Sequence, residues 1–203
     1  MPERKIPRRP PGARARARTV RVPARKTIGL ATARAIAQEL RRRLEFRPLR
    51  PLRPAKGPGA VRAASHLVGS ARRGAPRSAD VDLVVVVPPG RALSELALRG
   101  RGRAALGRAS GGERHRIVAA RWGSRRVTLD IFATAARELP FALFHWTGPA
   151  AYNVRTRALA RRRGWRLNQY GLFDAAGRRV GRARTERDVA RLLGVSWRRP
   201  EDR

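Results

Sequence analysis

The feature that most constrains the fold is a run of aliphatic residues in the middle of the chain, 81–87, which reads VDLVVVV. Valine fills five of its seven positions, and β-branched side chains favour extended backbone. The Pro88-Pro89-Gly90 sequence that follows cannot continue a strand. A buried strand is therefore predicted at the centre of the fold, and the other elements are expected to pack around it.

The flanking sequence predicts an α+β fold in which helices pack on a mixed sheet. Ile36, Leu40 and Leu44 recur every four residues and indicate a helix within 26–46. Further strands are expected at 66–68, 115–121 and 126–133. Three leucines, Leu93, Leu96 and Leu98, predict a short helix, and the Pro- and Gly-rich segments 48–59 and 100–112 predict loops.

A second, small α/β unit is predicted to begin at residue 139. It contains an aromatic cluster, and we expect a helix at 150–163 and a hairpin at 165–180. Thr185 with Asp188 three residues later predicts a capped helix at 186–193. The expected organisation is a disordered basic tail (1–25), a larger α+β domain (26–138) and a C-terminal domain (139–203).

The charge of the chain points to a polyanionic partner. There are 48 Lys and Arg against 14 Asp and Glu, a net charge of +34, and only three of the basic residues are Lys. Phosphate contacts by such side chains drive nucleic-acid binding that weakens with salt. A G+C-rich coding sequence would also favour Arg over Lys, but it does not explain the shortage of acids. The absence of Cys excludes disulfides, zinc ribbons and thiol nucleophiles.

Three acidic residues stand beside the predicted strands. Asp80 and Asp82 alternate at the start of the central strand, so both carboxylates project from one face. Asp130 lies in the strand-like sequence VTLDIF at 127–132 and joins them if the two strands are neighbours. Such a cluster fits two Mg²⁺ ions, with Mn²⁺ as a substitute. The alternative interpretation of Asp-x-Asp is a strand-end turn or an Arg-paired surface dyad.

A glycine-containing turn precedes the acids by ten residues. Gly69 and Ser70 follow a predicted strand, and Arg73 and Gly74 come soon after. Glycine allows the backbone to approach a ligand closely, and Arg73 would offset charge on phosphate oxygens. Together with Asp80 and Asp82, this turn predicts a site for a triphosphate and its metal ions.

The order Gly-Ser, Arg-Gly, Asp-x-Asp resembles the nucleotidyltransferase superfamily. Within it, the segments FHWTGP at 144–149 and RRRGWRLNQYGLF at 161–173 resemble family X DNA polymerases, especially the minimal virus-encoded type of African swine fever virus. The resemblance spans about residues 26–200 and implies a nucleotidyltransferase palm at 26–138. Thr128 departs from it, because many members have an Arg there beside the primer terminus.

The resemblance also implies residue roles. Asp80, Asp82 and Asp130 would be the catalytic metal ligands. The residues implied to bind the nucleotide are Gly69, Ser70, Arg73, His145, Trp146, Thr147, Gly148 and Asn153. The residues implied to contact DNA are Arg157, Arg161, Arg162, Arg163 and Arg166. Without the resemblance, His145 would be taken as an ordinary helix-end histidine, Trp146 as a core residue, and the arginines at 161–163 as a solvated helix end.

The expected function is addition of dNTPs to a primer 3′-hydroxyl at gaps or nicks in duplex DNA, as in base excision repair, by a monomer. No lyase domain is expected, since 1–25 is too short for one and only three Lys are present. Family analogy implies a DNA ligase in the same pathway, and a viral enzyme would act in the virion, host cytoplasm or nucleus. The alternatives are an RNA-tailing or small-molecule nucleotidyltransferase, and a non-catalytic basic DNA-binding protein.

Overall fold

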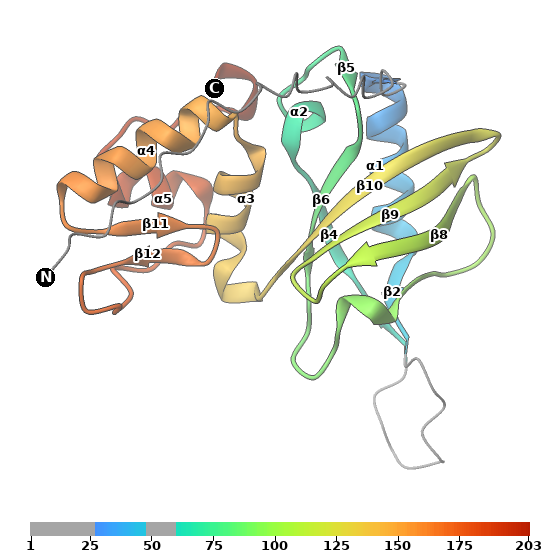
Figure 1. The fold of residues 1–203 in the computed structure, drawn as a ribbon, viewed down its shortest axis with the longest axis horizontal. Helices are drawn as coiled ribbons and strands as arrows, with labels where there is room; N and C mark the ends of the chain where they lie inside the picture. Colours follow the sequence, from blue (N-terminus) through green and yellow to red (C-terminus); the bar gives the residue numbers. More distant parts are fainter. Residues whose placement is uncertain (1–26, 48–59) are drawn as a thin grey trace, which may run out of the picture.

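A twisted five-stranded sheet forms the centre of the protein (Figure 1). The computed structural model describes residues 27–47 and 60–203, so the predicted tail and the predicted loop at 48–59 lie outside the described residues. The strand order is β4-β6-β10-β9-β8. The five strands are β4 (Ala64–Leu67), β6 (Val81–Val86), β8 (Ala104–Gly111), β9 (His115–Trp122) and β10 (Arg125–Thr134). Only β6 and β10 run parallel among the pairs in this sheet, and the predicted central strand is indeed buried.

One face of the sheet packs against α1 (Leu30–Arg43). Alternate residues of β6, Val81, Leu83 and Val85, share a hydrophobic cluster with the buried stripe of this helix. That stripe consists of Ala33, Ile36, Ala37 and Leu40. The four-residue apolar repeat in the sequence therefore predicted both the helix and the face that it buries. The helix ends at Arg43, and the next three residues form β2 (Leu44–Phe46).

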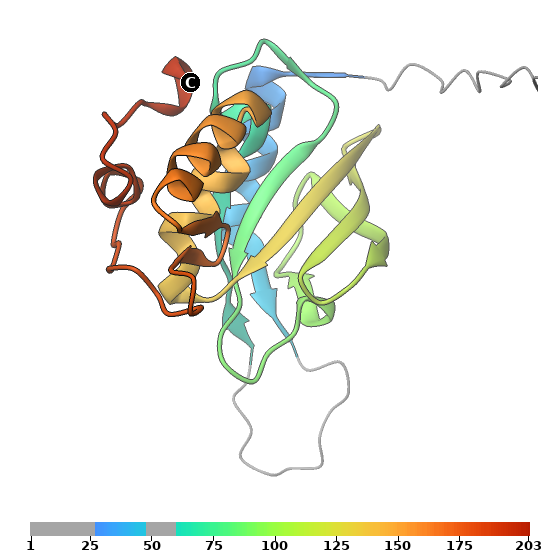
Figure 2. The ribbon, with the colours of Figure 1, turned by 60° about the vertical axis from the view of Figure 1, so that its left-hand side comes forward.

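The C-terminal elements build a second cluster beside the sheet. They are α3 (Leu139–Thr147), α4 (Ala150–Arg162), β11 (Arg166–Asn168), β12 (Gly171–Phe173) and α5 (Glu186–Leu192). Phe141, Phe144 and Tyr152 pack there with Leu172 and Val189. Figures 1 and 2 both show α3 between the sheet and the remaining C-terminal elements. Ala142 on α3 packs against Val84 and Phe132, on the face of the sheet opposite α1.

Small elements complete the described fold. β1 (Ile28–Gly29) pairs with β5 (Arg77–Ser78), and β2 pairs with both β3 (Val61–Arg62) and β7 (Leu96–Leu98). The remaining elements are α2 (Gly69–Arg72) and three 3₁₀ turns, Leu93–Glu95, Ala136–Glu138 and Pro200–Asp202. Over the described ranges, no helix is long and apolar enough to cross a bilayer.

Two local expectations were wrong. The predicted helix at Leu93–Leu98 is a 3₁₀ turn followed by β7, because pairing with β2 satisfies its backbone. The predicted loop at 100–112 contains β8, which pairs with β9 through a register shift between Leu106 and Ala109. Gly107 lies in that shift, where a β-carbon would come within 2.7 Å of the Ala119 carbonyl oxygen. The glycines that suggested a loop thus accommodate an irregular strand.

The capping box predicted at Thr185 is confirmed. Asp188 N donates to Thr185 Oγ1 at 3.2 Å, and Thr185 N donates to Asp188 Oδ2 at 2.9 Å. Replacing Thr185 with Ala should lower the free energy of unfolding by about 1 kcal/mol, because the backbone N–H of Asp188 loses the hydroxyl that accepts its hydrogen bond. Urea unfolding would measure this loss. Thr185→Ser, which keeps the hydroxyl, should lose far less, and equal losses in the two variants would contradict the capping assignment.

Candidate active site

Three carboxylates meet on the face of the sheet that is turned towards α3. Because β6 and β10 are parallel, Asp82 lies directly opposite Asp130, and Asp80 precedes β6 by one residue. Burial, Asp80 and then Asp130 together raise the pKa of Asp82 to about 7, whereas Arg73 lowers it. The repulsion acting on Asp82 shows that the three acidic groups form one electrostatic site.

The donor set of this site fits a hard divalent cation. Carboxylate oxygens are the ligands that Mg²⁺ prefers, and a cation would relieve the repulsion that raises the pKa of Asp82. In the described part of the chain, no three His, Cys, Asp or Glu side chains already stand at metal-binding spacing. Asp130 is instead hydrogen bonded through Oδ1 to His115 Nε2, at 3.2 Å. Side-chain reorientation, Asp130 included, would therefore accompany metal binding.

The glycine turn lies directly against Asp82. Gly69 has a φ of +64°, and a β-carbon at this position would stand 1.8 Å from Asp82 Oδ2. Val68 N donates to the Asp82 carbonyl oxygen at 2.9 Å, which ties the turn to β6. The Ser70 hydroxyl is hydrogen bonded to Ser78 Oγ at 2.9 Å. The structure therefore brings Gly69 and Asp82 together as the sequence predicted, and it gives Ser70 a protein partner.

Arg73 connects the acidic site to the end of α3. Its guanidinium donates to the Thr147 carbonyl oxygen, and the Asp82 carboxylate raises its pKa against a larger lowering by burial. Gly148 follows with a φ of +66°, and a β-carbon there would stand 3.2 Å from Arg73 Nη1. The Gly148–Pro149 peptide bond is cis. The turn after α3 is thus shaped closely around the Arg73 side chain.

His145 is oriented by two residues of α4. Arg157 Nη2 donates to His145 Nδ1 at 3.0 Å, and Asn153 Nδ2 donates to the His145 carbonyl oxygen at 2.7 Å. Burial, followed by the charge of Arg157, lowers the pKa of His145 to about 4. The imidazole is therefore neutral near pH 7. The expected nucleotide-binding residues His145 and Asn153 are in contact, and Arg157 is bound to His145.

Trp146 is turned towards the sheet. Its ring stacks on Phe132 with a centroid separation of 3.7 Å, and Phe132 stacks on His115 at 4.6 Å. Sequence reasoning missed His115 and Phe132. No spacing signal could have found them, because they face each other only through the register of β9 and β10.

The sequence also gave no sign of a network behind Arg73. Arg72 donates to Thr147 Oγ1 and pairs with Glu186, and Arg203 Nη2 pairs with the other Glu186 oxygen at 2.9 Å. The Arg203 side chain is 0% exposed and lies over the rings of Phe144 and Tyr152. Glu186 is over one hundred residues from Arg72 in the chain, so only the folded structure could show that they pair.

The remaining predicted DNA-binding residues lie at and after the end of α4. Arg161, Arg162, Arg163 and Arg166 are all exposed. The guanidinium of Arg163 lies over Trp165, and that of Arg166 lies over Phe173. A separate groove of about 610 Å³ runs along β9 and β10 beside the acids. Ile117, Ala119 and Thr128 line its floor, and Arg121 and Arg126 flank it.

The class of protein follows from comparison of this fold with known proteins. Residues 142–203 match the family model described as DNA polymerase beta thumb. The protein aligns over 138 residues with Repair DNA polymerase X of African swine fever virus, isolate Tick/Malawi/Lil 20-1/1983, at 35% identity. That alignment covers 67% of this chain and 79% of the viral enzyme.

Two further DNA polymerases are similar to this chain, one in sequence and one in structure. Rat DNA polymerase lambda is 30% identical over 158 residues, which cover 66% of this chain and 28% of that enzyme. The crystal structure of Leishmania infantum polymerase beta in a ternary P/T complex superposes with a TM-score of 0.63 and 20% identity, over 88% of this chain and 77% of that one. The fold is thus polymerase beta-like. The chain belongs to the family X DNA polymerases.

Gly69→Ala tests the contact between the glycine turn and Asp82. The added methyl group would overlap Asp82 Oδ2 and strain a left-handed backbone, so nucleotidyl transfer should fall by about 100-fold or more. Gly29→Ala is the matched control, because nothing lies within 4 Å of its β-carbon position and its φ is negative. Gly69→Ala activity within a few-fold of the control would refute the close-approach argument.

The raised pKa of Asp82 predicts a pH-dependent stability. Folded Asp82 holds a proton up to about pH 7, whereas the unfolded group loses it near 3.8, so ionisation costs stability as pH rises between these values. In metal-free buffer, Asp82→Asn should therefore be more stable than wild type at pH 8, by up to about 4 kcal/mol, and similar to it at pH 4. Denaturant unfolding at both pH values measures the difference.

Asp174→Asn is the control for that measurement. The backbone N–H of Arg178 holds the pKa of Asp174 below its usual value, and Asp174 lies in the hairpin region away from the acids. This variant should gain no stability at pH 8. An Asp82→Asn variant that is no more stable than wild type at pH 8 would contradict the cost of ionising Asp82 that burial, Asp80 and Asp130 impose.

Proposed function

We propose that this protein is a DNA-directed DNA polymerase that adds dNTPs to a primer 3′-hydroxyl and releases pyrophosphate. The observation that carries the proposal is the pairing of Asp82 with Asp130 across two parallel strands, next to Asp80, in a chain of family X. Family membership supports DNA as template, and the excess of 34 positive charges supports binding to it.

Asp80, Asp82 and Asp130 would hold the divalent metal ions. When bound, Mg²⁺ would lower the pKa of the primer hydroxyl and neutralise charge on the phosphates. Asp82 would be fully ionised only above pH 7 without a cation, so a bound cation would also shift this group to its ionised form. Mg²⁺ as the metal, with Mn²⁺ as a substitute, belongs to the proposal.

The glycine turn and Arg73 would receive the triphosphate. Gly69 leaves backbone surface open beside Asp82, because it has no side chain to cover it. Arg73 already donates to the Thr147 carbonyl oxygen, which fixes the guanidinium near Asp82. A cation held in this way can stabilise charge on transferring phosphates without reorganising. Ser70 would exchange its bond to Ser78 for one to a phosphate oxygen.

His145, supported by α4, would contact the incoming nucleoside together with Gly148, whereas Thr147, which is 0% exposed, would contribute to the nucleotide site by holding Arg72 and Arg73. Arg157 Nη2 lies within hydrogen-bond distance of both ring nitrogens of His145, and burial with the charge of Arg157 lowers the pKa of the ring to about 4, so it remains neutral near pH 7. Asn153 holds the backbone of His145. Trp146 packs on Phe132, which places α3 firmly on the sheet. The proposed role of Trp146 in nucleotide binding therefore acts through the position of its neighbour His145.

The primer would lie in the groove along β9 and β10. Its floor of Ile117, Ala119 and Thr128 suits the apolar face of a sugar, and Arg121 and Arg126 stand where backbone phosphates would pass. This arrangement would position the primer without the Arg that many relatives have at Thr128. Arg161, Arg162, Arg163 and Arg166 would bind duplex phosphates from the C-terminal unit.

The finer features of the function are also proposals. We infer a palm at 26–138 and a C-terminal nucleotide- and DNA-binding domain at 139–203, supported by the separate hydrophobic clusters. Action at gaps or nicks in base excision repair and cooperation with a DNA ligase rest on analogy with family X, and the proposed absence of lyase activity rests on the presence of only three Lys in the sequence. The relatives named Repair DNA polymerase X support the repair assignment.

Single-nucleotide extension on one-nucleotide-gapped DNA with Mg²⁺ tests the function. Wild type should add the templated dNTP, and Asp130→Asn should lower the rate at least about 100-fold, because a metal ligand is lost. Asp174→Asn, an exposed acid changed in the same way, should keep wild-type activity. Preference for ATP without template dependence would favour an RNA-tailing or small-molecule enzyme. Tight DNA binding without any turnover would favour a non-catalytic binding protein.

A further inference from the structure

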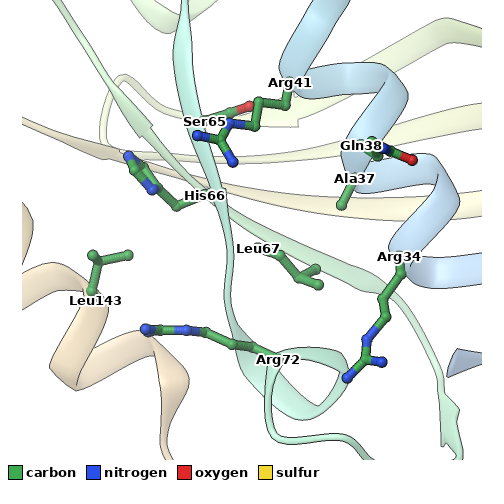
Figure 3. A pocket seen from close by; sticks show the side chains of 9 residues that line it. All are labelled: Arg34, Ala37, Gln38, Arg41, Ser65, His66, Leu67, Arg72 and Leu143. Carbon is green, nitrogen blue, oxygen red and sulfur yellow. The ribbon is translucent and has the colours of Figure 1, made fainter.

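A cavity of about 270 Å³ opens between α1, α2, α3 and the edge strand β4 (Figure 3). Figure 3 shows Arg34 and Arg41 reaching from α1, Ser65 and His66 on β4, and Arg72 closing one side. Neither β6 nor β10, which carry the paired carboxylates, lines it. The cavity is therefore separate from the proposed active site.

The cavity gathers positive charge with no acid in its lining. Arg34 and Arg41 are seven residues apart and share one face of α1. Within residues 27–47 and 60–203, neither of them pairs with a carboxylate, whereas Arg72 is already paired with Glu186. Burial, then the charges of Arg41 and Arg72, lower the pKa of His66, which lines the same cavity.

A buried hydroxyl in the same lining lacks a partner. Ser65 is 3% exposed, and its Oγ has no hydrogen bond. Buried polar groups are nearly always satisfied, and an exception calls for an explanation such as a missing ligand. The strand that carries Ser65 is at the edge of the sheet, so one side of its backbone has no strand partner in the described structure. These groups distinguish the cavity from the arginines scattered elsewhere on the surface.

We propose that this cavity binds a phosphate group. Guanidinium groups match phosphate oxygens in shape and charge, and Arg34, Arg41 and Arg72 present three of them around one cavity. The volume is slightly below the range of about 300–1,000 Å³ for whole small-molecule ligands, so it fits a phosphate with little more than its sugar. The phosphate belongs either to the backbone of a bound DNA strand or to a small free phosphate.

The test uses the imidazole of His66 as a local reporter. The chain has three His, and loss of one proton signal in His66→Gln would identify the His66 resonance by NMR. Titration of the full-length protein with inorganic phosphate should shift that resonance saturably. In the double variant Arg34→Gln/Arg41→Gln, the apparent affinity should fall about tenfold or more. The control Arg42→Gln/Arg101→Gln removes the same charge from two residues that are exposed, as Arg34 and Arg41 are, but lie outside the cavity, and it should leave the titration unchanged.

A DNA-binding measurement distinguishes the two sources of phosphate. If a DNA strand enters the cavity, the Arg34/Arg41 variant should bind gapped DNA more weakly than the control, with a slope of log K against log[salt] smaller by about 1–2. If the ligand is a small phosphate, the two variants should bind DNA alike while only the first loses the phosphate titration.

The inference is overturned if phosphate leaves the His66 resonance unmoved, or moves it equally in both variants. The phosphate titration needs no polymerase activity, so its outcome is independent of the proposed function.

Discussion

Electrostatic repulsion among three carboxylates is the constraint around which the rest of the site is built. Parallel pairing of β6 and β10 forces Asp82 and Asp130 side by side, and burial makes the ionised form of Asp82 costly. The fold tolerates this arrangement because a large apolar cluster holds both strands against α1. Arg73 supplies the nearby positive charge, and it is itself held by the end of α3. The face of the sheet that carries the acids thus depends on a well-packed core behind it.

The two hydrophobic clusters are connected by charged groups as well as by packing. Glu186 accepts from Arg72 on one oxygen and from Arg203 on the other. Because Glu186 is buried and has both oxygens paired, removing either arginine would leave part of a carboxylate unsatisfied. This pairing couples the position of α5 to that of α2, and hence to the glycine turn at the acids. Orientation of the C-terminal unit therefore bears directly on the proposed triphosphate site.

Local sequence patterns predicted those elements in which neighbouring residues all favour the same secondary structure. The valine run, the four-residue repeat of α1 and the Thr185 cap each carry their signal within a few positions. β8 was missed because its Gly and Arg residues are weak strand formers, and β7 was missed because its leucines favour a helix equally well. In both cases pairing with a neighbouring strand decided the structure. The candidate site also contains some features that local sequence shows and others that only the folded structure shows. Asp80 with Asp82 was visible as spacing, but the contacts of Asp130 with His115 and of Arg72 with Glu186 arise only from register and tertiary packing.

The column of rings from Trp146 through Phe132 to His115 sets the kind of motion that α3 can make. The ring planes are within 10° and 13° of parallel, and they lie between a helix of one cluster and the sheet of the other. Stacked flat surfaces lose contact when pulled apart but keep most of it when they slide. A shear of α3 parallel to these ring planes therefore costs the least energy. A hinge-like opening that separates Trp146 from Phe132 costs more. Because His115 is hydrogen bonded to Asp130, such a slide would also displace a carboxylate of the proposed metal site.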